Sequence, residues 1–266
     1  MPVLVTAAHH PLARRLAARL LEEGGEVRVT ADGDVGALRA AGAFVATATA
    51  DDEGRLEAAL AEVHTVVHVG GGLGTERAQR LVDDVEVVVR AAAGARVRRV
   101  IAVSVTGAAL DANDPLRRAK AAVEERMAAL DCPTIVLRLG LVDTPRLRDA
   151  LLTAGLTPEQ LATPIRPVRL DDVLELVVAF DRARSEASTG HLVVAAEGPV
   201  ELSVAGYLDR VTGSSGGRGS RLGRRLPDPE EVARLAQVLA GPWTSTEPHL
   251  VDGWAFAGIT PGTPGP

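Results

Sequence analysis

The chain has 266 residues, of which 46% are hydrophobic and 24% are charged. This is enough for one large α/β domain with a small C-terminal addition. The net charge of −6 disfavours nucleic acid and anionic membranes as partners. A single cysteine, Cys132, excludes an intramolecular disulfide and a multi-cysteine metal site. Because the sequence has no long apolar span and no signal-type N-terminus, we expect a cytoplasmic protein without a membrane segment.

The first predicted elements are an apolar strand over residues 3–7 and a helix that follows a tight turn. Leu12, Leu16 and Leu20 fall on one face of this helix. A strand, a tight turn and a helix in this order open a nucleotide-binding βαβ unit. We therefore expect a dinucleotide at the N-terminus of the first helix, where backbone N–H groups favour a phosphate.

The turn lacks the glycines that normally allow the bend and the close approach of a pyrophosphate. Ala7, His10 and Ala13 hold those places. Alanine adds only a methyl group, and His10 precedes Pro11, which suits the first turn of a helix. We place His10 near the N-cap, where either His9 or His10 can donate to a phosphate; the alternative is a turn that binds nothing. No acid or cysteine nearby completes a metal site around the two histidines, so we expect no metal.

The segment after the second predicted strand, residues 26–31, gives two indications about the cofactor. Asp32 follows this strand and favours the free 2′-hydroxyl group of NAD. Arg14, Arg15 and Arg28 are candidate partners for the 2′-phosphate of NADP. The residues alone therefore leave the choice of cofactor open.

Two further strand ends carry features of a ligand site. Four glycines stand in the five positions 70–74, directly after a predicted strand over 65–69. They would let a flat ligand approach the backbone, and the alternative is a flexible loop. The strand over 99–105 ends at Thr106, and the next predicted strand, over 134–139, ends in a turn. In open α/β sheets, ligands bind at the carboxyl ends of the strands, where these features meet.

The regular alternation of strands and helices weakens after residue 143. Four prolines interrupt residues 144–168, which predicts a cap over the sheet rather than another regular unit. A helix over about 171–183 and a strand over 191–195 follow. We therefore predict a Rossmann-like, doubly wound parallel α/β sheet with a small C-terminal substrate-binding cap. Residues 1–143 would form the dinucleotide-binding core, and residues 144–266 would complete that core and cap the substrate site.

Other features have mainly structural interpretations. The basic run Arg96, Arg98 and Arg99 is interpreted as a solvated edge. Trp254 belongs to a stretch that could form either an apolar lid or part of the core. A last helix is predicted over 228–239.

Four short motifs occur in the order in which the short-chain dehydrogenase/reductase superfamily has them. The sequence resembles this superfamily over roughly residues 1–215, in particular its atypical, NmrA-like and extended members. The family motif Thr-Gly-x-x-Gly-x-x-Gly corresponds to Thr6, Ala7, His10 and Ala13, and the motif His-Leu-Ala-Ala or Asn-Ala-Gly resembles Val67 to Gly71. The strand with the serine-rich motif resembles Val100 to Thr106, and the motif Leu-Arg-Pro-Gly-x-Val resembles Leu137 to Val142. Each motif alone is weak evidence, whereas four in the right order form a more specific pattern.

The resemblance implies a set of site residues. The family turn over 140–142 contacts the nicotinamide carboxamide with its backbone, and Lys120 matches the family lysine that holds the nicotinamide ribose. Ser104, Thr106 and Lys120 are the implied catalytic residues. Gly72, Leu73, Thr106, Leu116 and Arg146 are the expected substrate-binding residues, and Arg146 would meet an acidic substrate group. The expected cofactor-binding residues are Thr6, Ala8, His9, His10, Pro11, Leu12, Ala31, Asp32, Thr49, Ala50, Val69, Gly70, Gly71, Ser104, Lys120, Gly140, Leu141 and Val142.

The family's proton donor is missing from this sequence. In the family a tyrosine stands four residues before the lysine, but position 116 holds leucine, whose side chain neither gives nor takes a proton. Tyr207 is the only tyrosine and lies far along the chain, so we do not expect it to replace the missing acid. Lys120 keeps two interpretations, a ribose ligand or an exposed helix residue.

Two hypotheses follow from the resemblance and this gap. The first is an NADPH-dependent ketoreductase, with NADH as the alternative cofactor, which acts on a small-molecule aromatic polyketide in antibiotic biosynthesis. It rests on the similarity of the whole chain to angucyclinone (simocyclinone-type) polyketide ketoreductases. Such a substrate could supply its own proton from a hydroxyl group beside the carbonyl, with Ser104 or Thr106 orienting the oxygen. The second hypothesis is a non-catalytic, NmrA-like dinucleotide sensor. Either would be a monomer or a homodimer.

Overall fold

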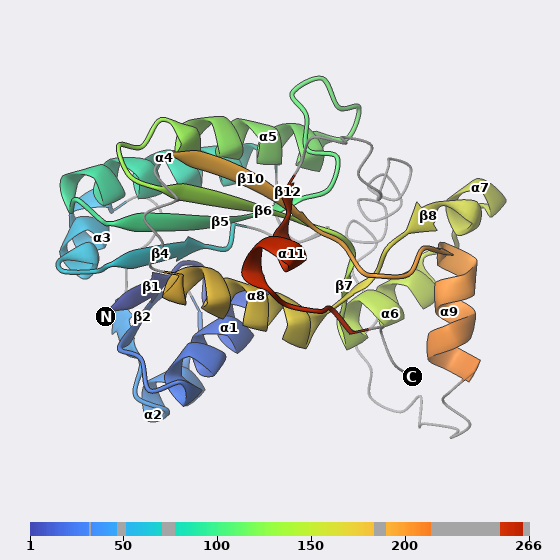
Figure 1. Ribbon diagram of the computed structural model, residues 1–266, viewed down its shortest axis with the longest axis horizontal. Coiled ribbons are helices and arrows are strands. Elements are labelled where there is room, and N and C mark those ends of the chain that lie inside the picture. Colours follow the sequence, from blue (N-terminus) through green and yellow to red (C-terminus); the bar gives the residue numbers. More distant parts are fainter. Residues whose placement is uncertain (32, 47–51, 71–77, 184–189, 214–250, 263–266) are drawn as a thin grey trace.

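The computed structural model describes residues 1–31, 33–46, 52–70, 78–183, 190–213 and 251–262. Its centre is an eight-stranded sheet in the order β12-β10-β6-β5-β4-β1-β2-β3, and every neighbouring pair is parallel (Figure 1). The order of the first six strands is that of the doubly wound nucleotide-binding fold, which confirms the predicted fold class. The strands are β1 (Val3–Val5), β2 (Val27–Thr30), β3 (Phe44–Ala46), β4 (Thr65–His68), β5 (Arg99–Val105), β6 (Thr134–Leu139), β10 (His191–Ala196) and β12 (Val251–Asp252).

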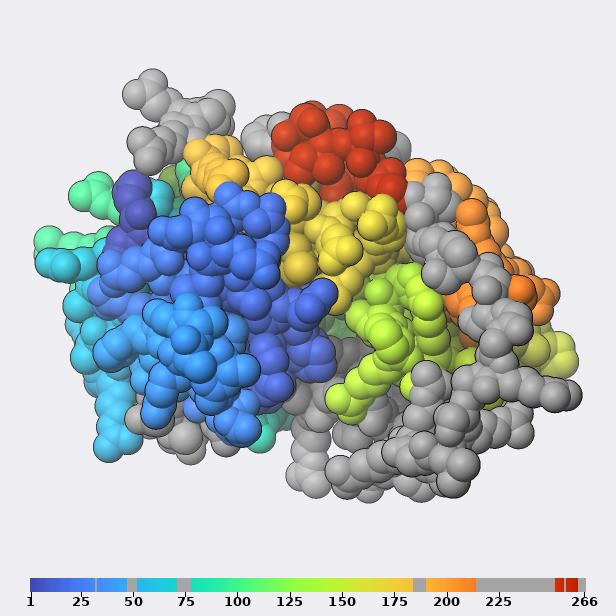
Figure 2. All heavy atoms as spheres, turned by 90° about the horizontal axis from the view of Figure 1, so that it is seen from below, coloured from blue at the N-terminus to red at the C-terminus, as the bar shows by residue number. Residues whose placement is uncertain are grey.

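Helices cover both faces of the sheet. Along β5, Val100 and Ala102 join the apolar cluster of one face, whereas Ile101 and Val103 join that of the other. This alternation explains why the strand is apolar throughout, because a parallel sheet with two covered faces needs apolar residues on both. Figure 2 displays α1, α8 and α11 side by side across the second face. The first face carries α3 (Glu53–Leu60), α4 (Ala78–Gly94) and α5 (Pro115–Ala128), and the second carries α1 (Pro11–Glu22), α2 (Gly36–Ala40), α8 (Leu170–Arg182) and α11 (Gly253–Ala257).

A group of short elements follows the carboxyl end of β6. Residues 144–168, for which we predict a cap and not another regular strand–helix unit, contain two helices, because Thr144 and Thr157 each cap a helix that has proline as its first residue. These helices pack with α9, on the right of Figure 1. The elements of this group are β7 (Val142–Asp143) paired with β9 (Val168–Arg169), β8 (Pro164–Ile165) paired with β11 (Leu202–Ser203), α6 (Pro145–Thr153), α7 (Pro158–Ala162) and α9 (Val204–Gly213).

The structure overturns the interpretation of Arg99 and decides between the two alternatives for Trp254. Arg99 is not at a solvated edge, since only 7% of it is exposed. Its guanidinium donates to the carbonyl oxygens of Phe180 and Ala183, both at 2.6 Å, and so caps the C-terminus of α8. Trp254 belongs to the core and not to a lid, and its indole N–H donates to the Glu197 carbonyl oxygen over 2.8 Å.

Some expectations fall on residues that the structure does not describe, among them the last predicted helix. Within the described ranges, no helix has both the length and the apolar character that a membrane crossing requires. Among the same residues, no group of three or more histidine, cysteine, aspartate or glutamate side chains could hold a metal ion.

Candidate active site

The turn after β1 adopts a bend that usually requires glycine. Ala7 has a φ of +54°, in the left-handed region, and its carbonyl oxygen accepts from the His10 N–H over 2.8 Å. The next amide, that of Ala8, donates to the Thr30 carbonyl oxygen over 2.7 Å. His10 is the N-cap of α1, and its Nδ1 accepts from the Leu12 N–H. The predicted N-cap is therefore confirmed, and an alanine holds a strained position.

Replacing Ala7 with glycine is expected to stabilise the protein by up to about 1.6 kcal/mol. Relief of the left-handed alanine gains about 1–2 kcal/mol, and the greater freedom of the unfolded chain takes back about 0.4–1 kcal/mol. Denaturant unfolding of both proteins measures the difference. Ala13→Gly, inside α1, is the matched control and should lower the free energy of unfolding by about 0.5–1 kcal/mol. If Ala7→Gly also lowered it, Ala7 would not be strained.

The two histidines of the turn lie beside different parts of the sheet edge. A methyl group placed on Gly33, after β2, would lie 3.5 Å from Cβ of His9. Burial, and next the charges of Lys120, His9 and Arg146, lower the pKa of His10 to about 4. His10 is therefore neutral at neutral pH, and since Nδ1 accepts the capping bond, Nε2 carries the proton and can donate it.

The ends of β1 and β4 are joined by a threonine and a histidine. Thr6 Oγ1 accepts from the Val69 N–H over 3.2 Å and lies 3.1 Å from His68 Nδ1. His68 Nε2 has no hydrogen-bond partner among the residues that the structure describes. A methyl group on Gly70 would lie 2.6 Å from this nitrogen, so glycine is needed there. Burial, and next the charge of Lys120, lower the pKa of His68 to about 3.

This lowered pKa predicts that the protein loses stability in mild acid. The unfolded chain binds a proton on His68 near its ordinary pKa of 6.5, whereas the folded chain binds it only at about 3. Stability is therefore complete above the unfolded pKa and falls as the pH drops towards 3. From about pH 8 to about pH 5, this one group should cost about 2 kcal/mol. Urea unfolding at both pH values measures the loss, and His68→Gln should reduce it; an unchanged loss would contradict the assignment.

Lys120 lies on α5 and is buried, with 1% of the residue exposed, so it is not an exposed helix lysine. Its Nζ donates to the carbonyl oxygen of Gly70 and, over 3.0 Å, to that of Val103. The ammonium group therefore sits between the ends of β4 and β5. Leu116, one helical turn earlier, is also buried and belongs to the same apolar cluster as Leu141.

Ser104 makes a structural contact that the expected catalytic role did not include. Its hydroxyl group donates to the carboxylate of Glu124, on α5. Glu124 also forms an ion pair with Arg138 of β6, with 2.7 Å between Oε2 and the guanidinium. The hydroxyl group thereby links β5 to the helix layer, and the expectation that Ser104 orients a substrate oxygen stays a prediction.

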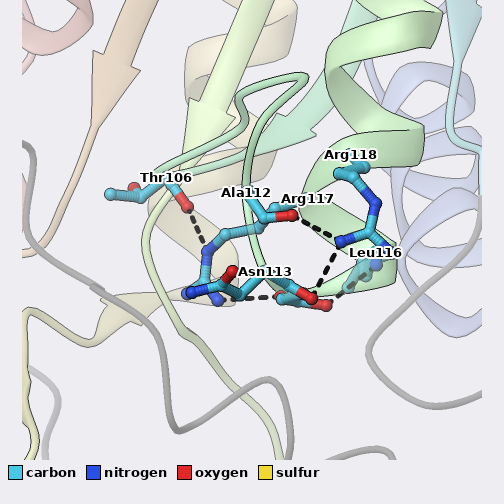
Figure 3. A network of polar contacts seen from close by, with 7 residues as sticks. Thr106, Ala112, Asn113, Leu116, Arg117 and Arg118 are labelled. Carbon is cyan, nitrogen blue, oxygen red and sulfur yellow. Dashed lines mark hydrogen bonds and ion pairs between the residues drawn. The ribbon is translucent and has the colours of Figure 1, made fainter.

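Thr106 is held at the end of β5 from several sides. Its Oγ1 lies 3.2 Å from the Leu139 carbonyl oxygen and 3.3 Å from Oε1 of Glu197. Its own carbonyl oxygen accepts from Arg117 Nε over 3.1 Å, and Arg117 is paired with Asp114 (Figure 3). Arg118 donates to the carbonyl oxygens of Ala112 and Asn113, which fixes the preceding loop on the start of α5.

Glu197 is a polar residue of this edge that sequence reasoning missed. It follows β10 directly, and the Gly140 N–H of the neighbouring turn donates to the Ala196 carbonyl oxygen over 3.0 Å. A methyl group on Gly140 would lie 2.7 Å from the Arg166 carbonyl oxygen, so this turn also requires glycine. The signal in the sequence was the position of Glu197 just after a predicted strand.

Tyr207 lies in α9 and is completely buried. Its hydroxyl group donates to Asp143, which also pairs with Arg148 at 2.6 Å. Burial, and then the bond to Asp143, raise the pKa of Tyr207 well above its ordinary value. Both effects disfavour loss of its proton, and the contact holds α9 against β7.

The remaining expected residues divide into three groups. Pro11 and Leu12 start α1, Ala31 follows β2, and Leu141 and Val142 continue the turn after β6. Arg146 is the second residue of α6, is exposed, and acts electrostatically on His10. Six expected residues lie outside the described part of the chain: Asp32, Thr49, Ala50, Gly71, Gly72 and Leu73.

No protein-family model and no curated protein matches the sequence. Solved structures do match. The triphenylmethane reductase of Citrobacter sp. complexed with NADP(H) has a TM-score of 0.75 and 16% identity, over 98% of this chain and 97% of that one. MoeE5 in complex with UDP-glucose and NAD has a TM-score of 0.73 and 17% identity, over 99% of this chain and 94% of that one.

A third similar structure is a nucleoside-diphosphate-sugar epimerase from Staphylococcus aureus. It has a TM-score of 0.71 and 12% identity, over 99% of this chain and 98% of that one. This chain shares their fold. The likeness extends over the whole length of each protein, so the elements after β6 belong to the shared fold as well.

Proposed function

We propose that this protein is an NADPH-dependent ketoreductase that reduces a carbonyl group of an aromatic polyketide of the angucyclinone type, in antibiotic biosynthesis. The observation that carries the proposal is the buried ammonium group of Lys120 at the ends of β4 and β5. The resemblance to short-chain dehydrogenases/reductases assigns the nicotinamide ribose to the lysine at this position. The reductase of Citrobacter sp., which binds NADP(H), offers an oxidoreductase precedent on the same fold.

The residues of the sheet edge fit a nicotinamide dinucleotide. The N-terminus of α1 and the Nε2 proton of His10 would hold the pyrophosphate. Lys120 would hold the ribose, and the turn that starts at Gly140 would bind the carboxamide. Gly70 and Gly140 are both positions where a side chain would collide with neighbouring atoms. When bound, the reduced nicotinamide supplies the hydride.

Of the arginines that could bind a 2′-phosphate, Arg14 remains a candidate and Arg28 does not. Arg14 is exposed and donates to the Asp34 carbonyl oxygen over 2.9 Å, in the segment that follows β2. A 2′-phosphate on the adenosine ribose would lie near this segment. Arg28 is bound to the carbonyl oxygens of Ala59 and Ala61, so it is not available as a phosphate partner. NADH remains the alternative through Asp32.

The proton requires a source other than the usual phenol. Leu116 has no proton to give, and Tyr207 is buried and bonded to Asp143. A hydroxyl group beside the reacting carbonyl of the substrate would supply the proton, and Thr106 would orient the substrate oxygen. Aromatic polyketides carry this arrangement of hydroxyl and carbonyl groups. Arg146, exposed beside His10, would meet an acidic group of the substrate.

Loss of nicotinamide absorbance on mixing the protein with NADPH and a hydroxyquinone ketone tests the proposal. We expect NADPH oxidation with this substrate and little with a ketone that lacks the neighbouring hydroxyl group. Tyr207→Phe should keep the rate, because Tyr207 is not the acid.

The competing function is a non-catalytic, NmrA-like dinucleotide sensor, which the substitutions at Ala7, His10, Ala13 and Leu116 favour. NADPH that binds but is not oxidised by any hydroxyquinone would support the sensor and overturn the reductase. If Thr106→Ala reduced simple ketones as well as the hydroxyquinone, substrate-assisted proton transfer would be wrong.

A further inference from the structure

Two buried cations on α5 reach the edge of the sheet. Arg117 and Lys120 are each 1% exposed and stand three residues apart, so they lie on one face of the helix. Arg117 Nε donates to the Thr106 carbonyl oxygen over 3.1 Å, at the end of β5. Lys120 Nζ donates to the carbonyl oxygen of Val103 on the same strand, over 3.0 Å, and to that of Gly70 after β4. The helix is therefore bound to the strand ends at two points, about one turn apart.

The guanidinium group of Arg117 is itself held in place by the start of α5. It donates to Oδ2 of Asp114 over 2.8 Å, and the other oxygen of this carboxylate accepts from the Leu116 N–H, also over 2.8 Å (Figure 3). Asp114 is the N-cap of α5, so the pair joins the guanidinium to the first turn of the helix. A buried charge is tolerated where it is paired and hydrogen-bonded. Here the second partner of the guanidinium is the main chain of Thr106.

Thr106 is held on its other sides by β6 and by the residue after β10. Its N–H donates to the Leu139 carbonyl oxygen over 3.0 Å. Its hydroxyl group donates to the same carbonyl oxygen over 3.2 Å and to Oε1 of Glu197 over 3.3 Å. These contacts fix Thr106 relative to the sheet. Arg117 adds a contact with α5, the helix that carries Lys120, and so fixes Thr106 relative to that lysine as well.

We propose that Arg117 is a positioning residue that sets the place of Thr106 relative to Lys120; this inference rests on the proposed ketoreductase function. In that function Lys120 holds the nicotinamide ribose and Thr106 orients the substrate oxygen. The relative position of these two side chains therefore sets how the nicotinamide meets the carbonyl carbon. Because Leu116 offers no hydrogen bond to the substrate, this alignment depends on Thr106, and a misplacement of about 1 Å costs about 100-fold in rate. Arg117 is buried and acts through the main chain of Thr106.

The first test uses Arg117→Lys, because lysine has a methylene group in the place of Nε and still offers a positive charge to Asp114. With a hydroxyquinone ketone, turnover per NADPH-binding site should fall by about 10- to 100-fold. Fluorescence titration counts the sites. The Kd of NADPH and the KM of the ketone should change little, since the groups that bind them remain. A merely structural role predicts fewer binding sites with normal turnover at each. Arg118→Lys is the matched control, because Arg118 donates to carbonyl oxygens of the preceding loop; it should behave as the wild type.

The second test is a double-variant cycle with Thr106→Val, which removes the hydroxyl group that Arg117 positions. Thr106→Val alone should lower turnover by about 10-fold or more, and Arg117→Lys should add little to this loss. Losses that multiply, or normal turnover per site in Arg117→Lys, would overturn the inference and leave the ketoreductase in place. If Arg117→Lys does not fold, Arg117→Met combined with Asp114→Asn removes both charges and takes its place in the same cycle. If the wild type itself oxidises no NADPH, the proposed function is wrong.

Discussion

Replacing Lys120 with methionine is expected to abolish most of the NADPH oxidation. The ammonium group is buried and donates to the carbonyl oxygens of Gly70 and Val103. These contacts hold it at the position that we propose for the nicotinamide ribose. A hydrogen bond to a charged group contributes about 1.5–3 kcal/mol, so its loss should weaken NADPH binding by about 10- to 100-fold. Turnover should fall at least as far, because the nicotinamide is no longer positioned against the carbonyl carbon.

Fluorescence titration with NADPH measures the binding, and nicotinamide absorbance measures the turnover. Arg126→Met is the matched control on the same helix, because Arg126 forms an exposed ion pair with Glu86. Exposed pairs contribute about 0–1 kcal/mol, so this variant should bind NADPH as the wild type does. Normal binding by Lys120→Met would remove Lys120 from the cofactor site.

Replacing Glu124 with glutamine is expected to cause the largest loss of stability, about 3–5 kcal/mol. Glu124 accepts from Ser104 and pairs with Arg138 at 2.7 Å, and the side chains of the pair are only 8% and 12% exposed. Removing the negative charge leaves the buried guanidinium without its counter-ion. For a protein of this size, Tm should fall by about 10 °C.

The double variant Glu124→Gln, Arg138→Met distinguishes the contribution of the ion pair to stability from that of the other contacts of Glu124. If the ion pair carries the effect, the double variant should be more stable than Glu124→Gln alone. Glu86→Gln breaks the exposed pair with Arg126 and should change Tm by at most a few degrees. Equal losses for Glu124→Gln and Glu86→Gln would show that burial of the pair does not matter.

Much of the fold could be predicted because apolar runs and helix caps are local signals. The bounds of β5 and β6 follow from apolar runs between polar residues, and Asp114 with Pro115 marks the start of α5. The two short helices after β7 were missed, although Thr144 and Thr157 carry the same kind of signal. Their prolines were interpreted as breaks and not as first helical residues.

The candidate site could be predicted only in part, because it depends on which strands lie side by side. The turn after β1 and Lys120 of α5 could be found from the order of motifs along the sequence. The N-cap role of His10 could be predicted because Pro11 follows it. The direction of the Ser104 hydroxyl group depends on its contact with α5. Glu197 meets Thr106 only because β10 pairs with β6. Neither fact is encoded in local sequence.

Transfer of deuterium from C4 of labelled NADPH to a hydroxyquinone ketone tests the central claim most directly. A protein that aligns nicotinamide and carbonyl without a phenol at position 116 should yield product with one deuterium on the new carbinol carbon. Mass spectrometry of the product detects it. Labelled NADPH that binds tightly and is recovered with its deuterium, beside unchanged ketone, would contradict the redox account.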